Sequence, residues 1–273
     1  MYYGEILKKL QDEDKNPVNR MYLHEISMKW QVFQQLAEDY QKAENKELVA
    51  ALNEFITSLS NRKYKYNPSS RNGFQDDSPL FSARYLDDLV TVLIQRTEIQ
   101  KKIGVSWGYQ AFSIHLKFNP PSLMLMGINP MFEQNMSVPV LSLVQKMDFQ
   151  FRITGKRNYR KYRIAFPLIQ FHDFKNLNEL DYIRVDHYAK LAKETFSKSR
   201  SIVISETLED RFVPNIRTSS FDAIFVLKKQ YRSEGSGELS LQTVNLLEER
   251  IRELLNERPE ESLGFKNEGI IEE

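Results

Sequence analysis

The 273-residue sequence contains no cysteine. This absence excludes disulfides, a thiolate nucleophile and zinc sites built on cysteine ligands. It also fits a reducing compartment, and we expect the protein to be located in the bacterial cytoplasm.

The sequence also lacks long hydrophobic runs. A membrane-spanning helix needs roughly 20 consecutive apolar residues, and no stretch of the chain approaches that length. Residues 1–10 carry charges within their short apolar runs, which is unlike a secretory signal peptide. The sequence therefore predicts a soluble protein.

An excess of charge of one sign is absent too. The chain has 38 basic and 37 acidic residues, so its formal net charge is only +1. Attraction to nucleic acid must therefore come from local basic clusters and not from the total charge. Aromatic residues, by contrast, make up 12% of the chain, which is far from the composition of disordered proteins and predicts an ordered core.

Helical periodicity marks the N-terminal third of the chain. Apolar residues in segment 21–59 recur at helical spacing, with charged residues between them. Segment 61–78 is rich in Asn, Ser, Pro and Gly, a composition typical of a loop, and a further helix is expected between it and Gly104. The predicted organisation is a helical N-terminal region for DNA or partner contacts (residues 1–77), a core region (78–258) and an acidic tail (259–273).

The rest of the chain consists mainly of short runs rich in Phe, Ile, Leu and Val, which are typical of β-strands. Segments 140–153 and 159–171 flank Gly155 and predict a long antiparallel hairpin. The elements expected to follow are a helix over residues 179–195, strands over 201–205 and 222–227, and a helix over 240–255. This order predicts an α/β fold in which a mixed β-sheet is flanked by helices.

Two carboxylates and a lysine stand on the predicted hairpin. Asp148 alternates with apolar neighbours and so lies on the opposite strand face, and Asp173 and Lys175 share one side of the second strand. If the strands pair around Gly155, Asp148 can approach Asp173. Carboxylate oxygens suit Mg²⁺, which activates water, and an ammonium group stabilises negative charge developing on a phosphate. The pattern predicts a magnesium site for phosphodiester hydrolysis.

Two downstream segments carry a resemblance to a known family. Residues 201–208 read SIVISETL, and residues 221–230 read FDAIFVLKKQ. This part of the sequence resembles type II restriction endonucleases of the PD-(D/E)xK superfamily, in particular the group with separate subunits for the two DNA strands. In that group an ETL strand end precedes an ID-I-VL-KQ strand, and the catalytic Glu-x-Lys lies at a matching distance before ETL. The resemblance covers residues 78–255 and is strongest over 166–255.

The resemblance implies a restriction-endonuclease-like fold and a sequence-specific, Mg²⁺-dependent enzyme that cuts double-stranded DNA in bacterial restriction-modification defence. The acidic position of Glu-x-Lys carries over to Asp173 and the family lysine to Lys175. The earlier family aspartate carries over to Asp148, although Met147 stands where the superfamily motif has proline. A symmetric DNA target would imply a homodimer, and an asymmetric target would imply a heterodimer with a related subunit.

Several assignments stay open in the sequence. The first metal-binding carboxylate is either Asp148 or, on the preceding helix, Asp87 or Asp88. Glu206 ends a buried-type strand and either caps the next turn or lies near the metal. His172 is expected on the opposite strand face from Asp173, in a packing role. Because the hairpin is longer than in the family and the proline is missing, the alternative function is a catalytically inactive DNA-binding subunit of a defence complex.

The predicted hairpin is strongly basic. Between residues 146 and 163 the only acidic residue is Asp148. A basic cluster of this kind neutralises backbone phosphates. The DNA-binding residues are therefore expected to be Lys146, Arg152, Lys156, Arg157, Arg160, Lys161 and Arg163.

Overall fold

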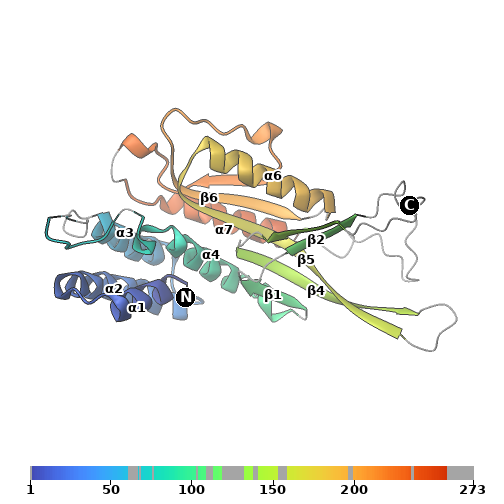
Figure 1. Cartoon of the computed structure of the whole chain (residues 1–273), viewed down its shortest axis with the longest axis horizontal. Coiled ribbons are helices and arrows are strands. Elements are labelled where there is room, and N and C mark those ends of the chain that lie inside the picture. The colour runs from blue at the N-terminus through green and yellow to red at the C-terminus, as the bar shows by residue number, and fades with distance from the viewer. Residues whose placement is uncertain are drawn as a thin grey trace.

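A computed structural model shows a layer of helices packed against a mixed β-sheet (Figure 1). The described residues are 2–60, 67, 69–75, 77–102, 104–108, 113–118, 132–137, 141–152, 159–195, 199–234 and 237–256.

Four helices precede the sheet in the chain. They are α1 (Tyr2–Glu13), α2 (Pro17–Glu38), α3 (Asn45–Ser60) and α4 (Arg84–Arg96). Asn16 sets the start of α2, because its side-chain oxygen accepts hydrogen bonds from two backbone N–H groups of the first turn. Pro17 follows at a position where its missing N–H costs no helical hydrogen bond.

The central sheet has five strands in the order β1-β4-β5-β6-β7. Their bounds are β1 (Val105–Gly108), β4 (Leu141–Arg152), β5 (Tyr159–Leu177), β6 (Arg200–Leu208) and β7 (Ala223–Val226). The first three strands in this order are antiparallel, and β6 and β7 continue the sheet in parallel with β5. A separate two-stranded sheet pairs β2 (Ser113–Phe118) with β3 (Phe132–Ser137).

Helices cover both faces of the central sheet. Helix α6 (Glu179–Thr195) makes the crossover from β5 to β6, and its Val185 and Ala189 pack against Val203 of β6. Helices α4 and α7 (Leu241–Asn256) share a hydrophobic cluster with residues of the opposite sheet face. The crossover places α6 on the sheet face opposite to α4 (Figure 1).

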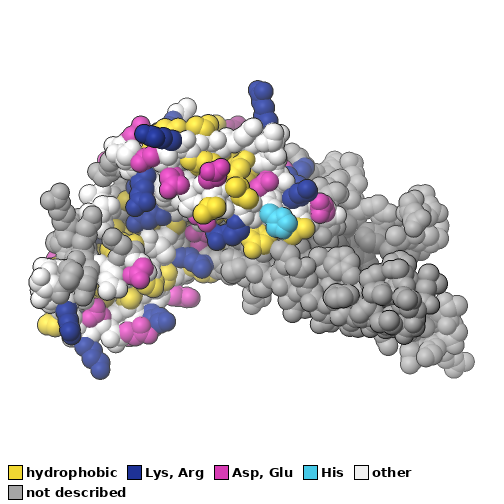
Figure 2. Space-filling model, turned by 45° about the horizontal axis from the view of Figure 1, so that its top comes forward, with side chains coloured by type: hydrophobic (Ala, Val, Ile, Leu, Met, Phe, Trp, Pro, Cys, Tyr) yellow, Lys and Arg dark blue, Asp and Glu magenta, His cyan; other side chains and the backbone are white. Residues whose placement is uncertain are grey.

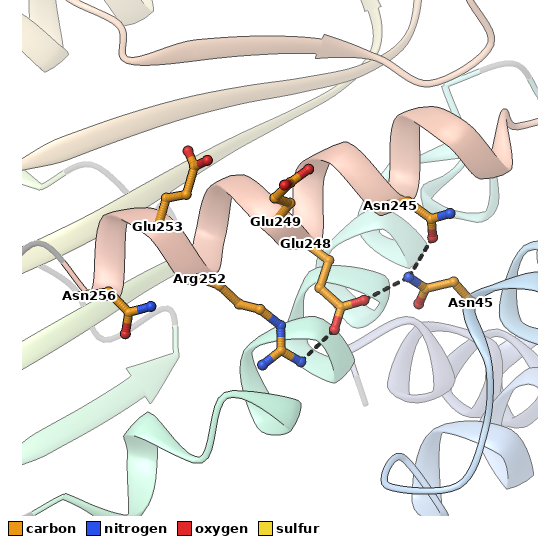
Figure 3. Close-up of a pocket in the computed structure, with 7 residues that line it drawn as sticks. All are labelled: Asn45, Asn245, Glu248, Glu249, Arg252, Glu253 and Asn256. Atoms are coloured by element: carbon orange, nitrogen blue, oxygen red, sulfur yellow. Dashed lines mark hydrogen bonds and ion pairs between the residues drawn. The ribbon is translucent and has the colours of Figure 1, made fainter.

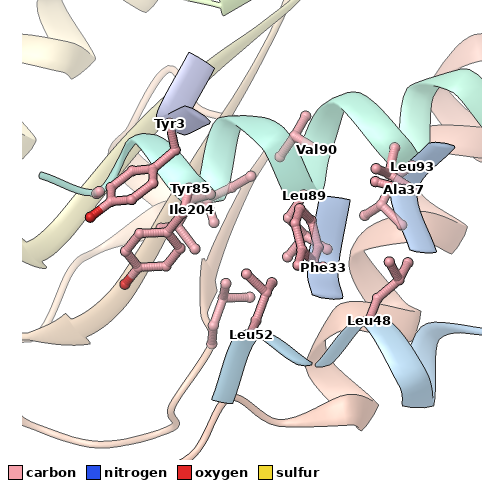
Figure 4. Packing of buried hydrophobic residues seen from close by; sticks show 14 of the residues in the cluster. Tyr3, Phe33, Ala37, Leu48, Leu52, Tyr85, Leu89, Val90, Leu93 and Ile204 are labelled. Carbon is pink, nitrogen blue, oxygen red and sulfur yellow. The ribbon is translucent and has the colours of Figure 1, made fainter. Parts of the chain in front are cut away.

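A single hydrophobic cluster joins the N-terminal helices to the sheet (Figure 4). Its members include one residue from each of α1, α2, α3, α4 and β6, all 0–1% exposed: Tyr3, Phe33, Leu52, Leu89 and Ile204. Helix α4 therefore packs on the helical layer and on the sheet at the same time.

The α/β fold predicted from the sequence is confirmed. Helix α6 has the predicted bounds, the hairpin pairs Arg152 with Tyr159 across its turn, and β6, β7 and α7 correspond to the last three predicted elements. Much of the predicted loop 61–78, and the acidic tail 259–273, lie outside the described residues.

Charges of both signs are interspersed over the described surface in Figure 2, which agrees with the small net charge. Among the described helices, none has the length and apolar character needed to cross a membrane.

Candidate active site

Asp173 and Lys175 lie near the C-terminal end of β5, where the strand loses one neighbour. Pairing with β4 ends at Leu141, opposite Phe171, whereas the parallel pairing with β6 continues and places Asp173 beside Ile204. Phe171 and Asp173 share a strand face because they are two residues apart, and Phe171 packs in the cluster that contains α4. Asp173 therefore lies at the margin of the core, on the α4 side of the sheet.

Asp87 of α4 meets Asp173 at this margin. The side chain of Asp87 is 1% exposed, and its carboxyl group forms a hydrogen bond with that of Asp173. Burial and the negative charge of Asp173 raise the pKa of Asp87 to about 9, and burial also raises the pKa of Asp173. A hydrogen bond between two carboxyl groups requires a shared proton, because an ionised carboxylate can only accept. A metal cation that replaced this proton would relieve the repulsion between two carboxylates.

Arg84 borders the carboxyl pair, and Lys175 follows two residues after Asp173 on β5. Nη1 of Arg84 lies 3.9 Å from Oδ2 of Asp87, and the Arg84 side chain is 40% exposed. Burial raises the pKa of both carboxyl groups, and the charge of Arg84 acts in the opposite direction on both. Lys175 is exposed, and its Nζ lies 5.3 Å from the centroid of the Phe81 ring, a cation–π contact. The pair is thus buried toward the core and bordered by positive charge toward solvent.

Asp88, the next residue of α4, has a different role. Its carboxylate oxygens accept hydrogen bonds from the backbone N–H groups of Tyr2 at 2.7 Å and Tyr3 at 2.9 Å. The hydroxyl of Tyr3 donates to the carbonyl of Leu80 at 2.5 Å. Of the two helix carboxylates that the sequence left open, Asp87 meets Asp173 and Asp88 anchors the start of α1.

Glu206 forms a buried ion pair. Its Oε2 lies 2.6 Å from Nζ of Lys228, and the two side chains are 3% and 8% exposed. Burial raises the pKa of Glu206, and the charge and hydrogen bond of Lys228 act against that rise. This pair joins the end of β6 to the segment that follows β7.

The donor set fits a hard divalent cation. Within the described part of the chain, no group of three or more His, Cys, Asp or Glu side chains gathers closely enough to hold a metal ion. Asp87 and Asp173, whose carboxyl groups are hydrogen-bonded to each other, would hold an ion bound at the end of β5. Mg²⁺ is commonly bound through one or two carboxylates, with water and substrate phosphates completing its shell. A pair of carboxylates satisfies that requirement.

Asp148 lies far from this pair. The hairpin register places it opposite Arg163, ten residues before Asp173 on β5 (163 to 173). At about 3.3 Å per residue this separation is roughly 30 Å along the strand. The expectation that Asp148 approaches Asp173 is wrong, because a hairpin that turns near Gly155 pairs each residue with one equally distant from the turn. Asp87 supplies the second carboxylate instead.

The basic residues expected to bind DNA belong to the β4–β5 hairpin, which extends beyond the helices as a paired arm (Figure 1). Lys156 and Arg157 lie outside the described residues. Of the other five only the strand positions are described: Lys146 and Arg152 on β4, and Arg160, Lys161 and Arg163 on β5. Their contact with DNA stays a prediction.

His172 has the packing role that the strand alternation predicted. Its side chain is 3% exposed, and burial lowers its pKa to about 3, so the imidazole is neutral at physiological pH. A buried neutral imidazole on the strand face opposite Asp173 is a part of the core and not of the carboxyl site.

A polar hollow of about 330 Å³ lies beside α7, and neither Asp87 nor Asp173 lines it (Figure 3). Glu248 accepts hydrogen bonds there from Asn45 at 2.7 Å and Arg252 at 2.8 Å, and pairs with Arg96 at 3.2 Å. Arg96 also donates to the carbonyl of Tyr40 at 2.9 Å. Because these side chains bind one another, they join α3, α4 and α7 at this hollow and have a structural role.

Sequence reasoning missed Arg84 and Lys228. Arg84 precedes Asp87 by three residues, a spacing that places both on one helix face, so this signal is visible in the sequence. Lys228 reaches Glu206 from beyond β7, and only the strand order brings the two together.

The sheet order, the α6 crossover and the position of the site at the end of β5 define a restriction-endonuclease-like fold. Among solved structures, the chain is similar to the native BbvCI A2B2 tetramer, with a TM-score of 0.52 and 15% sequence identity over 91% of this chain and 94% of that chain. At this identity the likeness concerns the fold. No protein-family model and no curated protein matches the sequence.

Proposed function

We propose that the protein is a Mg²⁺-dependent endonuclease that hydrolyses phosphodiester bonds in double-stranded DNA, as type II restriction enzymes do. The observation that carries this proposal is the hydrogen-bonded pair of Asp87 and Asp173, with Lys175 two residues further along β5. The fold supports it, since the chain has a restriction-endonuclease-like fold similar to that of the BbvCI A2B2 tetramer.

In this proposal Asp87 and Asp173 hold the ion, and Lys175 acts on the substrate. Bound Mg²⁺ would supply a Lewis acid that activates water and neutralises phosphate charge. Lys175 orients the attacking water and stabilises the negative charge that develops on the phosphate. The Phe81 ring contacts the Lys175 ammonium group through a cation–π interaction.

Double-stranded DNA is the proposed partner, and the basic β4–β5 arm is its proposed binding element. The roughly 30 Å between the arm's Arg163 position and Asp173 approaches one turn of B-DNA, which is about 34 Å. One duplex can therefore contact the carboxyl pair and the arm together. We propose assembly as a homodimer, or as a heterodimer with a related subunit, so that both DNA strands are cut.

The test is cleavage of supercoiled plasmid DNA in the presence of Mg²⁺. We expect wild-type protein to nick or cut the plasmid and Lys175→Ala to lose about 100-fold or more in rate, since one electrostatic group in a hydrolytic site is typically worth 10²–10³. Lys190→Ala is the matched control, because Lys190 is also exposed but belongs to α6, on the other face of the sheet. It should cut like the wild type.

The catalytically inactive DNA-binding subunit remains a second candidate. It is favoured by the separation of Asp148 from the site and by the finding that, among the described residues, no group of three or more His, Cys, Asp or Glu side chains could hold a metal ion. DNA binding without cleavage by wild-type protein in Mg²⁺ or Mn²⁺ would establish it and would sink the nuclease proposal. Equal cleavage by wild type and Lys175→Ala would show that the cutting arises elsewhere.

A further inference from the structure

Arg84 stands between the carboxyl pair and solvent. It is the first residue of α4 and lies one helical turn before Asp87. Its side chain is 40% exposed, whereas that of Asp87 is 1% exposed, and 3.9 Å separates Nη1 of Arg84 from Oδ2 of Asp87. The guanidinium group therefore covers the outer side of a site whose inner side is core.

The position of Arg84 also relates it to Lys175. Phe81, whose ring carries the Lys175 ammonium group, precedes Arg84 by three residues. The segment from Phe81 to Arg84 thus contacts the basic side chain of Lys175 from β5 and also carries the basic side chain of Arg84. Arg84 borders the carboxyl pair directly, and Phe81 connects the same segment to Lys175 of β5.

The ion pair between Arg84 and Asp87 is weak, so Arg84 can leave Asp87 for another anionic partner. At 3.9 Å it is longer than a direct charge-assisted hydrogen bond, and ion pairs exposed to this degree contribute little to stability. A divalent cation bound between Asp87 and Asp173 would take over the neutralisation that Arg84 now provides. The guanidinium group presents five N–H donors in a planar fork that matches phosphate oxygens.

We propose that Arg84 is a second phosphate-binding residue of this site and contacts the non-bridging oxygens of the scissile phosphodiester when a metal ion occupies the carboxyl pair. This inference rests on the proposed nuclease function and extends it to a residue of α4. In the free protein Arg84 neutralises the pair, and in the complex it neutralises the substrate.

The experiment compares Arg84→Gln with Arg250→Gln. Arg250 is a matched control, because it also pairs with an acid three residues later on a helix and is 34% exposed. Binding of a short mixed-sequence DNA duplex is measured with Ca²⁺ in place of Mg²⁺ over a range of salt concentrations. Arg84→Gln should lower the slope of log affinity against log salt by about one, as expected when one phosphate contact is lost. Arg250→Gln should leave the slope unchanged.

Two further readouts separate a phosphate contact from a structural role. Calorimetry with Mn²⁺ alone should show equal or tighter metal binding by Arg84→Gln, because a competing positive charge has been removed. The plasmid cleavage rate should fall by about 100-fold, the lower end for loss of one group that stabilises the transition state. Weaker metal binding together with an unchanged salt slope would overturn the inference and make Arg84 a support for Asp87.

Arg84→Lys decides the matter if Arg84→Gln fails to fold. It keeps the charge and loses the planar fork, so a reduced cleavage rate with an unchanged salt slope would support phosphate binding, and a wild-type rate would overturn it. If wild-type protein binds DNA without cutting it, the nuclease function fails. The salt slope of Arg84→Gln still decides the inference in that case: a decrease of about one supports it, and no decrease overturns it.

Discussion

At the residue scale, the buried carboxyl group of Asp87 lowers the stability of the free protein and is also a proposed ligand of the metal ion. A carboxyl group that is 1% exposed and hydrogen-bonded to a second acid is costly to ionise, and its pKa of about 9 expresses that cost. The repulsion between two buried carboxylates, which raises this pKa, is also what a bound cation would relieve. A carboxyl group that costs stability in the free protein is typical of functional sites.

We expect Asp87→Asn to stabilise the metal-free protein at neutral pH. The folded-state pKa of Asp87 is raised from 3.8 to about 9, so the folded wild type holds a proton that the unfolded chain has lost between these values. Wild-type stability therefore falls as pH rises through this window, by up to about 1.4 kcal/mol per pH unit, whereas Asn at this position does not titrate. Urea denaturation between pH 4 and pH 9 measures the difference.

The same variant tests the metal site. Mg²⁺ should raise the thermal unfolding temperature of the wild type, because an ion that binds only the folded state stabilises it. Mg²⁺ should leave the thermal unfolding temperature of Asp87→Asn unchanged. Asp39→Asn is the control, since Asp39 is exposed and pairs with Lys42 on the surface. An equal Mg²⁺ shift in wild type and Asp87→Asn would place the ion elsewhere.

At the element scale, α4 is the junction of the fold. Leu86, Leu89 and Leu93 are fully buried in the cluster that also contains α1, α2, α3 and the sheet. Asp87 and Asp88 leave the same helix toward different elements, β5 and α1. The position of the Asp87 carboxyl group, the proposed metal ligand, therefore depends on how firmly α4 is packed.

Asp88→Ala should weaken the attachment of α1 to α4. It removes the acceptor for the N–H groups of Tyr2 and Tyr3, and an unsatisfied buried donor costs about 1–3 kcal/mol. Asp88→Asn keeps one oxygen acceptor and should lose less. The measurement is the free energy of unfolding in urea. A loss below about 0.5 kcal/mol in Asp88→Ala, typical of neutral surface changes, would contradict this role.

At the scale of the whole molecule, the helical layer and the sheet share one core, because the cluster that begins at Tyr3 continues to Leu254. The boundary predicted near residue 77 marks a change in composition. The hydrophobic cluster contains residues from both sides of this boundary. Trp30, Phe33 and Phe55 of the helical layer are 0–1% exposed, and Phe55 stacks against Tyr85 of α4 with ring centroids 5.7 Å apart.

Deletion of residues 1–60 should therefore unfold the remainder. It would expose the buried face of α4, and burial of each large apolar side chain contributes about 1.5–3 kcal/mol. Circular dichroism and urea denaturation of the shortened chain, with the full chain beside it, provide the measurement. A cooperative unfolding transition in the shortened chain would show instead that residues 78–258 are an independent domain, as the sequence pattern predicted.

The sequence determined the elements and one half of the site. The bounds of α6 follow from local helical periodicity, and the side that Asp173 and Lys175 share follows from the period of a strand, so neither depends on distant residues. The resemblance in segments 201–208 and 221–230 also predicted the fold class that the structure confirms.

The tertiary structure decided which carboxyl group joins Asp173. The sequence placed Asp148 first and Asp87 and Asp88 as alternatives, and each stands on a suitable element. The choice depends on strand register, which sets Asp148 opposite Arg163, and on the packing of α4 against β5, which brings Asp87 into hydrogen-bonding contact. Both are long-range contacts, set by the fit of the whole core and not by neighbours in the chain.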